Sequence, residues 1–314
     1  MKASEILVAD DASEDDTAEI IESIGSPLIR LIRAESRQGI SANCNEMIRQ
    51  AKCRYLARMD ADDIALPDRF RLQMDRFRSS DVTILGTWAR RMGAADTLHA
   101  TPESDAEIRA SLGFSSPFVN PTVMFDRVPL GDDILYDPDI PFGADYDQFA
   151  RLRHRAKFGN IAMVTLHWRL HEKNAGSDPS SLRLQNQTVS RVRSRIWRES
   201  GFQLDEAEED ALDRLVRLPL PLLSKSEHLV SAFRKALLRS ESTMLWAPRS
   251  ALKTVFLEQW NYYCQVRAWG NIRVLPVWRK GVRELGGRTS LFAFSKIALK
   301  AVRIPLRFDN AVVL

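Results

Sequence analysis

The chain has 314 residues, of which 45% are hydrophobic and 27% charged, a composition typical of a globular protein and not of a disordered or collagen-like one. Its three cysteines are odd in number and lack metal-ligand spacing, which excludes a disulfide framework and a zinc ribbon and favours a reducing, cytoplasmic setting. No apolar run reaches the roughly 18 residues of a membrane span, and acidic residues come too early for a secretory signal.

The net charge of +4 is unevenly distributed along the chain. Residues 1–180 carry 22 basic and 29 acidic side chains, a net charge of −7, whereas residues 181–314 carry 23 and 12, a net charge of +11. An acidic front half suits a cation-assisted site, and a basic back half that contains tryptophans suits an anionic surface, either nucleic acid or a membrane leaflet. The alternative is that these charges only solvate helix faces.

Strand and helix patterns alternate through the first 85 residues. Short apolar runs predict strands, and apolar residues at helical spacing predict helices between them. The expected strands are 5–9, 28–32, 55–59 and 82–85, and the expected helices begin at Asp16, span 39–51 and begin at Pro67. Such alternation is typical of a parallel sheet with helices on both faces, in which ligands bind beyond the carboxyl ends of the strands.

The rest of the chain falls into two stretches. Between residues 87 and 142, prolines separate short apolar runs, which predicts substrate-facing loops and short strands of mixed direction. A helix over 145–157 and a strand over 161–170 are expected next, and from residue 180 onward the pattern is mostly helical with a break at 218–221. We therefore expect two domains, residues 1–180 and residues 181–314.

An acidic cluster, Asp60-Ala61-Asp62-Asp63, directly follows the third expected strand. Three carboxylates within four residues repel one another unless a positive charge neutralises them. A hard divalent cation such as Mg²⁺ or Mn²⁺ does so through oxygen ligands, with substrate phosphates completing its coordination. The alternative is a solvated loop or a set of carboxylates that cap a helix.

Five motifs occur in an order that resembles the family 2 glycosyltransferases of the GT-A fold. They are Asp10-Asp11-Ala12-Ser13 with Gly39 to Asn45, the acidic cluster with Pro67-Asp68-Arg69, Asn120 to Phe125, Ala144 to Asp147 with Arg151, and Trp168 to His171 with Asn174 and Ser177. The resemblance covers about residues 5–180. It implies an α/β fold with a mostly parallel, Rossmann-like GT-A sheet flanked by helices, and a mainly helical C-terminal region.

The resemblance also implies roles for residues that bind the donor and the metal. Asp11 would accept a hydrogen bond from the nucleotide base, Asp60 would face the ribose, and Asn45 would belong to the nucleotide-sugar site. Asp62 would bind the metal, Mg²⁺ or Mn²⁺, that bridges the diphosphate. His171 would be a further metal or diphosphate ligand; its alternative is an ordinary surface histidine.

Two further carboxylates have implied roles. Asp145 stands where the family places its general base, and the alternative is an ordinary carboxylate at a helix N-terminus. Asp63 is expected to cap or orient the turn that follows the acidic cluster.

The implied function is that of an inverting glycosyltransferase in surface-polysaccharide or glycolipid biosynthesis. It would move a single sugar from a nucleotide-sugar donor to a hydroxyl of a saccharide or lipid-linked acceptor, without nucleic acid as a partner. The sequence has no Gln-x-x-Arg-Trp element, which disfavours a processive synthase. Two alternatives stay open: a truncated, non-catalytic glycosyltransferase-like binding protein, and a cation-dependent nucleotidyltransferase.

The sequence departs from the family pattern at its start. Family members have a strand and a helix before the Asp-Asp-Ala-Ser loop, whereas only four residues precede the first expected strand here. The sheet is therefore expected to lack a central strand and to expose unpaired backbone edges and apolar surface. A mis-assigned start codon, a truncated gene and a diverged protein are the open explanations. Smaller departures are Ala12 and Ala144, where the family commonly has Gly and Glu.

The last 90 residues are strongly basic, with 16 basic and 5 acidic side chains, and contain Trp246, Trp260, Trp269 and Trp278. Residues 291–304 combine an apolar face with surrounding Lys and Arg, which predicts an interfacial helix. Such a helix would hold the protein peripherally on the inner face of the cell membrane, near a lipid-linked acceptor. The alternative is a Trp-rich helical subdomain that packs on the catalytic domain.

Overall fold

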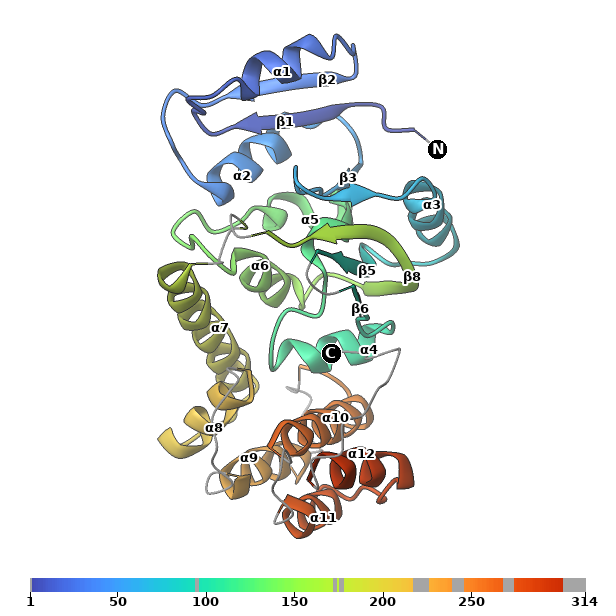
Figure 1. Ribbon diagram of the computed structural model, residues 1–314, viewed down its shortest axis with the longest axis vertical. Helices are drawn as coiled ribbons and strands as arrows, with labels where there is room; N and C mark the ends of the chain where they lie inside the picture. The colour runs from blue at the N-terminus through green and yellow to red at the C-terminus, as the bar shows by residue number, and fades with distance from the viewer. Residues whose placement is uncertain are drawn as a thin grey trace. The chain divides into compact units, whose positions relative to one another are not determined.

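Figure 1 shows the computed structural model, in which the strands among the described residues precede residue 170 and helices follow. The structure describes residues 2–93, 96–171, 174, 178–216, 226–238, 246–267 and 274–301. These residues form two compact units: 2–105 with 116–189, and 106–115 with 190–301. The segment 106–115 thus belongs to the second unit, while the two domains expected on either side of residue 180 stay a prediction.

The first unit contains two separate sheets. A small sheet pairs β1 (Ile6–Asp10) in parallel with β2 (Ile29–Arg33) and carries helices α1 (Thr17–Ser23) and α2 (Ile40–Gln50). The larger sheet has the order β3-β7-β5-β8-β4, with β6 also on β5. Its strands are β3 (Tyr55–Ala57), β4 (Ile64–Ala65), β5 (Ile84–Met92), β6 (Thr97–His99), β7 (Met124–Asp126) and β8 (Phe158–Arg169).

Helices and short turns connect the strands of the larger sheet. They are α3 (Arg69–Ser79), η1 (Asn120–Thr122), α5 (Arg127–Leu130), η2 (Gly131–Ile134), α6 (Ala144–Leu152) and the start of α7 (Pro179–Glu199). Each strand and helix expected in the first 85 residues is present, but several bounds differ. β3 ends at Ala57 and not at residue 59, β5 begins at Ile84 and not at residue 82, and β4 was not expected. α3 begins two residues after Pro67, and β5 continues to Met92.

The α/β fold with a helical C-terminal region is confirmed, but the larger sheet is mixed and not mostly parallel. β5 and β8 pair in parallel, whereas β3 with β7, β7 with β5, β5 with β6, and β4 with β8 are antiparallel. Parallel neighbours need a long crossover, while a short connection reverses the chain. Only four residues separate β5 from β6, so the two form a hairpin.

A buried amide links helix α3 to the sheet. Gln73 is fully buried, and its Nε2 donates to the carbonyls of Leu85 on β5 and Thr122 in η1 at 2.9 and 2.8 Å. Around it pack Met74, Phe77, Val82, Leu85 and Met124. One turn earlier, buried Arg69 donates from Nη2 to the carbonyl of Arg58 at 2.6 Å, which fixes the end of β3 where the acidic cluster begins.

His99 on β6 makes the stability of this unit sensitive to acid. Burial beside Arg91 lowers the pKa of His99 to about 4, against about 6.5 in an unfolded chain. Between these two values the unfolded chain takes up a proton that the folded protein does not, so stability falls as pH falls from 6.5 to 4. The unfolding free energy of the unmodified protein is expected to fall between pH 7 and pH 4.5. We expect the fall to be about 1–2 kcal/mol smaller in the His99→Gln variant.

Urea unfolding at both pH values measures this effect. His228→Gln is the matched control, because His228 is an exposed histidine on helix α9 (Ser226–Leu238). An unchanged pH dependence in the His99 variant would contradict the expectation.

The second unit has an aromatic core. It comprises α4 (Asp105–Leu112) and the end of α7, followed by α8 (Glu206–Val216), α9 (Ser226–Leu238), α10 (Arg249–Arg267), α11 (Val274–Glu284) and α12 (Leu291–Ala301). Helix α4 was not expected from the sequence. Phe114 makes edge contacts with Trp197, Phe233 and Phe256, at centroid distances of 6.5, 5.5 and 5.6 Å.

Three of the four C-terminal tryptophans belong to this core. Trp246, Trp260 and Trp278 are buried. Three parts of the sequence prediction lie outside the described residues: Trp269, the break at 218–221 and residues 302–304. On α12, Ala293 and Ile297 are buried, so this part of its apolar face packs within the protein. Within the described ranges, none of the helices has the length and apolarity needed to cross a membrane.

Candidate functional site

The acidic cluster forms a loop that is fixed at both ends. Asp60 pairs with Arg58, whose Nη2 lies 2.6 Å from Oδ1 of the carboxylate. Asp63 is buried, and its Oδ1 accepts a hydrogen bond from the backbone N–H of Arg169 at the end of β8, at 2.9 Å. Asp63 therefore orients the loop against β8, and Asp62 remains partly exposed between these two anchors.

Asp62 contacts the segment that follows β8. His171 Nε2 and Asn174 Nδ2 each lie 2.9 Å from Asp62 Oδ2, and Asn174 Oδ1 accepts from the backbone N–H of His171 at 2.6 Å. The contact joins two segments that are 109 residues apart in sequence. The structure therefore brings together the two residues that the sequence predicts as metal ligands.

The Asp62–His171 pair fits a divalent cation as two of its ligands. Adjacent ligands of an octahedral ion with bonds of about 2.1 Å lie about 3 Å apart, close to the 2.9 Å between Oδ2 and Nε2. A carboxylate oxygen with an imidazole nitrogen is a donor set that Mn²⁺ accepts. Among the described residues no group of three or more His, Cys, Asp and Glu gathers, so other positions would fall to substrate phosphates and water.

Asp145 is the second residue of α6. The helix begins directly after Gly143, which has φ 76°. Burial raises the pKa of Asp145, whereas the backbone N–H of Tyr146 and the charge of Arg58 favour its ionised form. Asp60 and Tyr136 also interact electrostatically with Asp145. The predicted base therefore interacts electrostatically with both members of the Arg58–Asp60 ion pair.

Asp11 lies just beyond β1, on the small sheet. Its carboxylate accepts hydrogen bonds from the backbone N–H groups of Gln38 at 2.7 Å and Gly39 at 3.0 Å, where the chain enters α2. Partial burial raises the pKa of Asp11, but these bonds outweigh it and hold the pKa below its usual range. Asp11 thus orders the loop before α2, and among the described residues its hydrogen bonds do not reach the acidic cluster.

Asn45 on α2 is buried, and both ends of its amide are bonded to one residue. Nδ2 donates to the Tyr136 carbonyl at 2.8 Å, and Oδ1 accepts from the Tyr136 backbone N–H at 2.7 Å. These bonds give Asn45 a positioning role, because they hold the backbone of Tyr136, which interacts electrostatically with Asp145. Its contact with a donor stays a prediction.

The sequence assigned no role to three residues of this site, although Asn174 belongs to one of the motifs. Arg58 holds Asp60 and contacts the Tyr136 hydroxyl, and Asn174 holds His171. An arginine at the end of an apolar strand is a usable signal, because buried arginines are almost always paired. Tyr136 has no such signal, since only the fold brings the loop before α6 to the end of β3.

Residues 2–125 match the family model described as glycosyl transferase family 2. This part of the chain is therefore similar to the family 2 glycosyltransferases. The match includes Asp11, Asn45, Asp60 and Asp62. Asp145 and His171 lie beyond it.

Curated relatives align with this chain over part of their length. The succinoglycan biosynthesis protein ExoO of Rhizobium meliloti is 29% identical over 160 residues, which are 45% of this chain and 45% of the relative. The O-antigen biosynthesis glycosyltransferase WbnJ of Escherichia coli is 29% identical over 133 residues, 39% of this chain and 51% of the relative. The aligned parts thus span about half the length of these two relatives.

A solved structure is also similar to the chain. It is residues 1–349 of S. aureus TarS in complex with UDP-GlcNAc, which is 14% identical with a TM-score of 0.48. The alignment covers 91% of this chain and 84% of that one.

Proposed function

We propose that this chain is a metal-dependent, inverting glycosyltransferase that moves a single sugar from a nucleotide-sugar donor to an acceptor hydroxyl. The observation that carries this proposal is the contact of Asp62 with His171, in a chain that is similar to the family 2 glycosyltransferases. Asp62, the proposed carboxylate ligand, stands two residues from Asp60, whose charge acts on the proposed base. A metal ligand and a base so arranged suit displacement at a sugar carbon next to a diphosphate.

Donor binding would use both sheets of the first unit. Asp11 would accept from the base at the end of β1, and Asp60 would face the ribose at the end of β3. Arg58 would keep Asp60 ionised and oriented, because their atoms lie 2.6 Å apart. Asn45 would act indirectly, by holding Tyr136 beside Arg58.

Asp62 and His171 would hold Mg²⁺ or Mn²⁺. The ion, when bound, supplies positive charge for the diphosphate of the donor. Asn174 would orient both ligands, since it is bonded to each of them. Asp63 would keep the loop against β8 through its bond to Arg169.

Asp145 would act as the general base. As the acceptor oxygen bonds to the anomeric carbon, the bond from that carbon to the diphosphate oxygen breaks, and the hydroxyl proton passes to the Asp145 carboxylate. Attack from the face opposite the leaving group inverts the anomeric configuration. Burial of Asp145 brings its pKa closer to neutrality, which makes it a better proton acceptor than an exposed aspartate.

Titration calorimetry with UDP and GDP, with and without Mn²⁺, tests the function. We expect binding of at least one nucleotide that depends on Mn²⁺. Absence of heat with every nucleoside diphosphate would favour the non-catalytic binding protein. Release of pyrophosphate from a nucleoside triphosphate would instead favour a nucleotidyltransferase.

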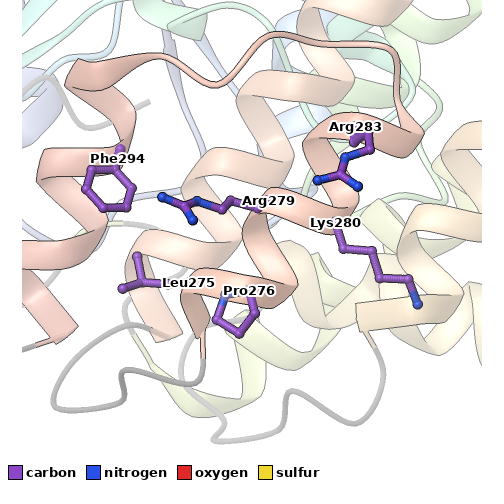
Figure 2. A pocket seen from close by; sticks show the side chains of 6 residues that line it. All are labelled: Leu275, Pro276, Arg279, Lys280, Arg283 and Phe294. Atoms are coloured by element: carbon purple, nitrogen blue, oxygen red, sulfur yellow. The ribbon is translucent and has the colours of Figure 1, made fainter.

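We further propose that the acceptor is lipid-linked and that the second unit contacts the inner face of the cell membrane. Residues of α11 and Phe294 of α12 line a hollow of about 500 Å³. Figure 2 shows the side chains that line it: Leu275, Pro276, Arg279, Lys280, Arg283 and Phe294. The Arg279 guanidinium lies 5.1 Å from the centre of the Phe294 ring. Cations around an apolar floor suit phosphate headgroups.

Reversing charge at this hollow is expected to weaken membrane binding. Arg279→Glu with Arg283→Glu should lower binding to phosphatidylglycerol vesicles at least tenfold, because each basic residue near an anionic surface contributes about 1 kcal/mol. Vesicle sedimentation measures this, with phosphatidylcholine vesicles as the neutral reference. Arg191→Glu with Arg234→Glu is the matched control, since both arginines are exposed elsewhere on the second unit. Equal binding by the two double variants would contradict the proposal.

A further inference from the structure

A second hollow, of about 580 Å³, adjoins the one in Figure 2. Its lining contains three arginines, Arg279, Arg283 and Arg288, and the hydroxyl groups of Thr289 and Ser290. Among the described residues, no Asp or Glu lines either hollow. A volume of this size suits a small molecule, and the lining suits an anion.

The first hollow adds apolar surface next to these cations. It shares Arg279, Arg283 and Phe294 with the second hollow, and Leu275 and Pro276 line it as well. In Figure 2, Arg279 extends toward the Phe294 ring, whose centre is 5.1 Å from the guanidinium carbon. The two adjoining hollows therefore combine a strongly cationic lining with an apolar one.

The turn between α11 and α12 brings Arg288 to the arginines of α11. Gly286, just after α11, has φ 67°, a left-handed conformation that glycine adopts without strain. Its N–H donates to the Arg283 carbonyl at 3.0 Å. The next N–H, of Gly287, donates to the Val282 carbonyl at 2.8 Å, which completes a Schellman motif. Because the chain folds back over the end of α11 here, Arg288 lines the same hollow as Arg283.

The three arginines lack carboxylate partners. Among the described residues, Arg279, Arg283 and Arg288 form no ion pair. Glu284 is the only acidic residue of α11, α12 has none, and Glu284 lies 3.9 Å from Lys280, which points away from Arg279 in Figure 2. Arg279 and Arg283 stand four residues apart on α11, a spacing at which like charges repel each other. An anion in the hollow would relieve this repulsion.

The lining specifies the kind of anion. An arginine fork matches the oxygens of a carboxylate or a phosphate, but a carboxylate has a single charge and two oxygens. A phosphate monoester carries a charge of about −1.5 to −2 at pH 7 and has three acceptor oxygens, so it can bond several guanidinium and hydroxyl groups at once. A phosphodiester carries only one charge. The apolar lining around Phe294 would pack against a hydrocarbon chain on the same molecule.

We propose that the two adjoining hollows bind a single alkyl phosphate monoester. Its phosphate would lie at Arg279, Arg283 and Arg288, and its alkyl chain would pack against Phe294. Such a complex differs from a general membrane contact, because it holds one molecule with a dianionic headgroup. Both hollows belong to the second unit, whereas the residues proposed to bind donor and metal belong to the first.

Titration calorimetry of the full chain with octyl phosphate, without nucleotide or metal, tests the proposal. We expect saturable binding of one molecule per chain. Arg288→Ala should weaken binding at least tenfold, because the exposed Arg288 lines the second hollow and supplies charge-assisted bonds to phosphate. Arg234→Ala, at an exposed arginine of α9 outside both hollows, should leave the affinity unchanged. Equal affinity of the two variants would overturn the proposal, and so would absence of binding.

Three further probes separate the headgroup from the chain. Octyl glucoside has the chain without charge, inorganic phosphate has the charge without a chain, and dihexanoyl phosphatidylglycerol is a phosphodiester lipid. Each should bind at least tenfold more weakly than octyl phosphate, because each lacks part of the match. Equal binding of inorganic phosphate would assign the hollow to free phosphate, and equal binding of the diester would assign it to ordinary membrane lipid. Either result would overturn the proposal, as would equal binding of the glucoside. None of these results depends on the proposed transferase activity.

Discussion

Asp62→Ala is expected to abolish the Mn²⁺-dependent part of nucleoside diphosphate binding, with at least a 100-fold loss of affinity. Asp62 supplies the carboxylate of the proposed metal pair, and a metal ion bound to phosphate oxygens contributes several kcal/mol. A loss of 100-fold corresponds to about 2.7 kcal/mol. The side chain is partly exposed, so its removal should leave the fold intact. Calorimetry with and without Mn²⁺ measures the change.

Asp68→Ala is the matched control for Asp62→Ala. Asp68 is an exposed carboxylate shortly after the acidic cluster, and its side chain pairs with Arg71 at 3.0 Å. Its removal should leave nucleotide affinity unchanged. Binding by Asp62→Ala that still depends on Mn²⁺ as in the unmodified protein would rule out Asp62 as a metal ligand.

Asp145→Asn is expected to lower the rate of sugar transfer by a factor of about 10² to 10⁴, the usual contribution of a general base. Donor affinity should be unchanged, because the proposed donor contacts are made by other residues. Release of nucleoside diphosphate in the presence of an acceptor measures the rate, and calorimetry measures donor affinity. Asp139→Asn is the control, since Asp139 is an exposed carboxylate in the loop before α6.

The pH profile provides an independent check on Asp145. A base must be ionised to accept a proton, and burial raises the pKa of Asp145. Activity is therefore expected to rise with pH through a value above the usual range of an aspartate, and the Asn variant should lose this limb. A full rate in Asp145→Asn, or a profile that the substitution leaves unaltered, would exclude the proposed role.

The elements that the sequence predicts best are those with strong local patterns. The first strands and helices follow from apolar periodicity and from stop signals such as Gly25 and Pro27. The short strands of mixed direction expected between residues 87 and 142 are present as β6 and β7, but the larger sheet as a whole is not mostly parallel, because strand pairing is decided by tertiary contacts and connection lengths. Helix α4 was missed, since it lies in a proline-punctuated stretch where irregular structure is the ordinary expectation.

The candidate site was predicted only in part, because some of its residues come together through tertiary contacts that no local pattern shows. Asp62 and His171 stand in motifs that the family resemblance singles out, and the structure brings them within 2.9 Å. Asn45 belongs to such a motif too, but its side chain faces Tyr136, which no local pattern connects to α2. Arg58 and Tyr136 acquire their roles only through folding. Arg58 stands far in sequence from both Tyr136 and Asp145, so no local pattern connects it to either of them.

The attachment of the small sheet has a consequence for how the protein responds to heat. β1 and β2 join the rest of the first unit through side chains, such as Asn45 and Ser41 of α2 bonded to the carbonyls of Tyr136 and Ile140, and not through a shared ladder of backbone bonds. A segment held in this way opens as a cooperative block before the global transition. On warming, the amides of the small sheet would lose protection first, and with them the loop that Asp11 orders.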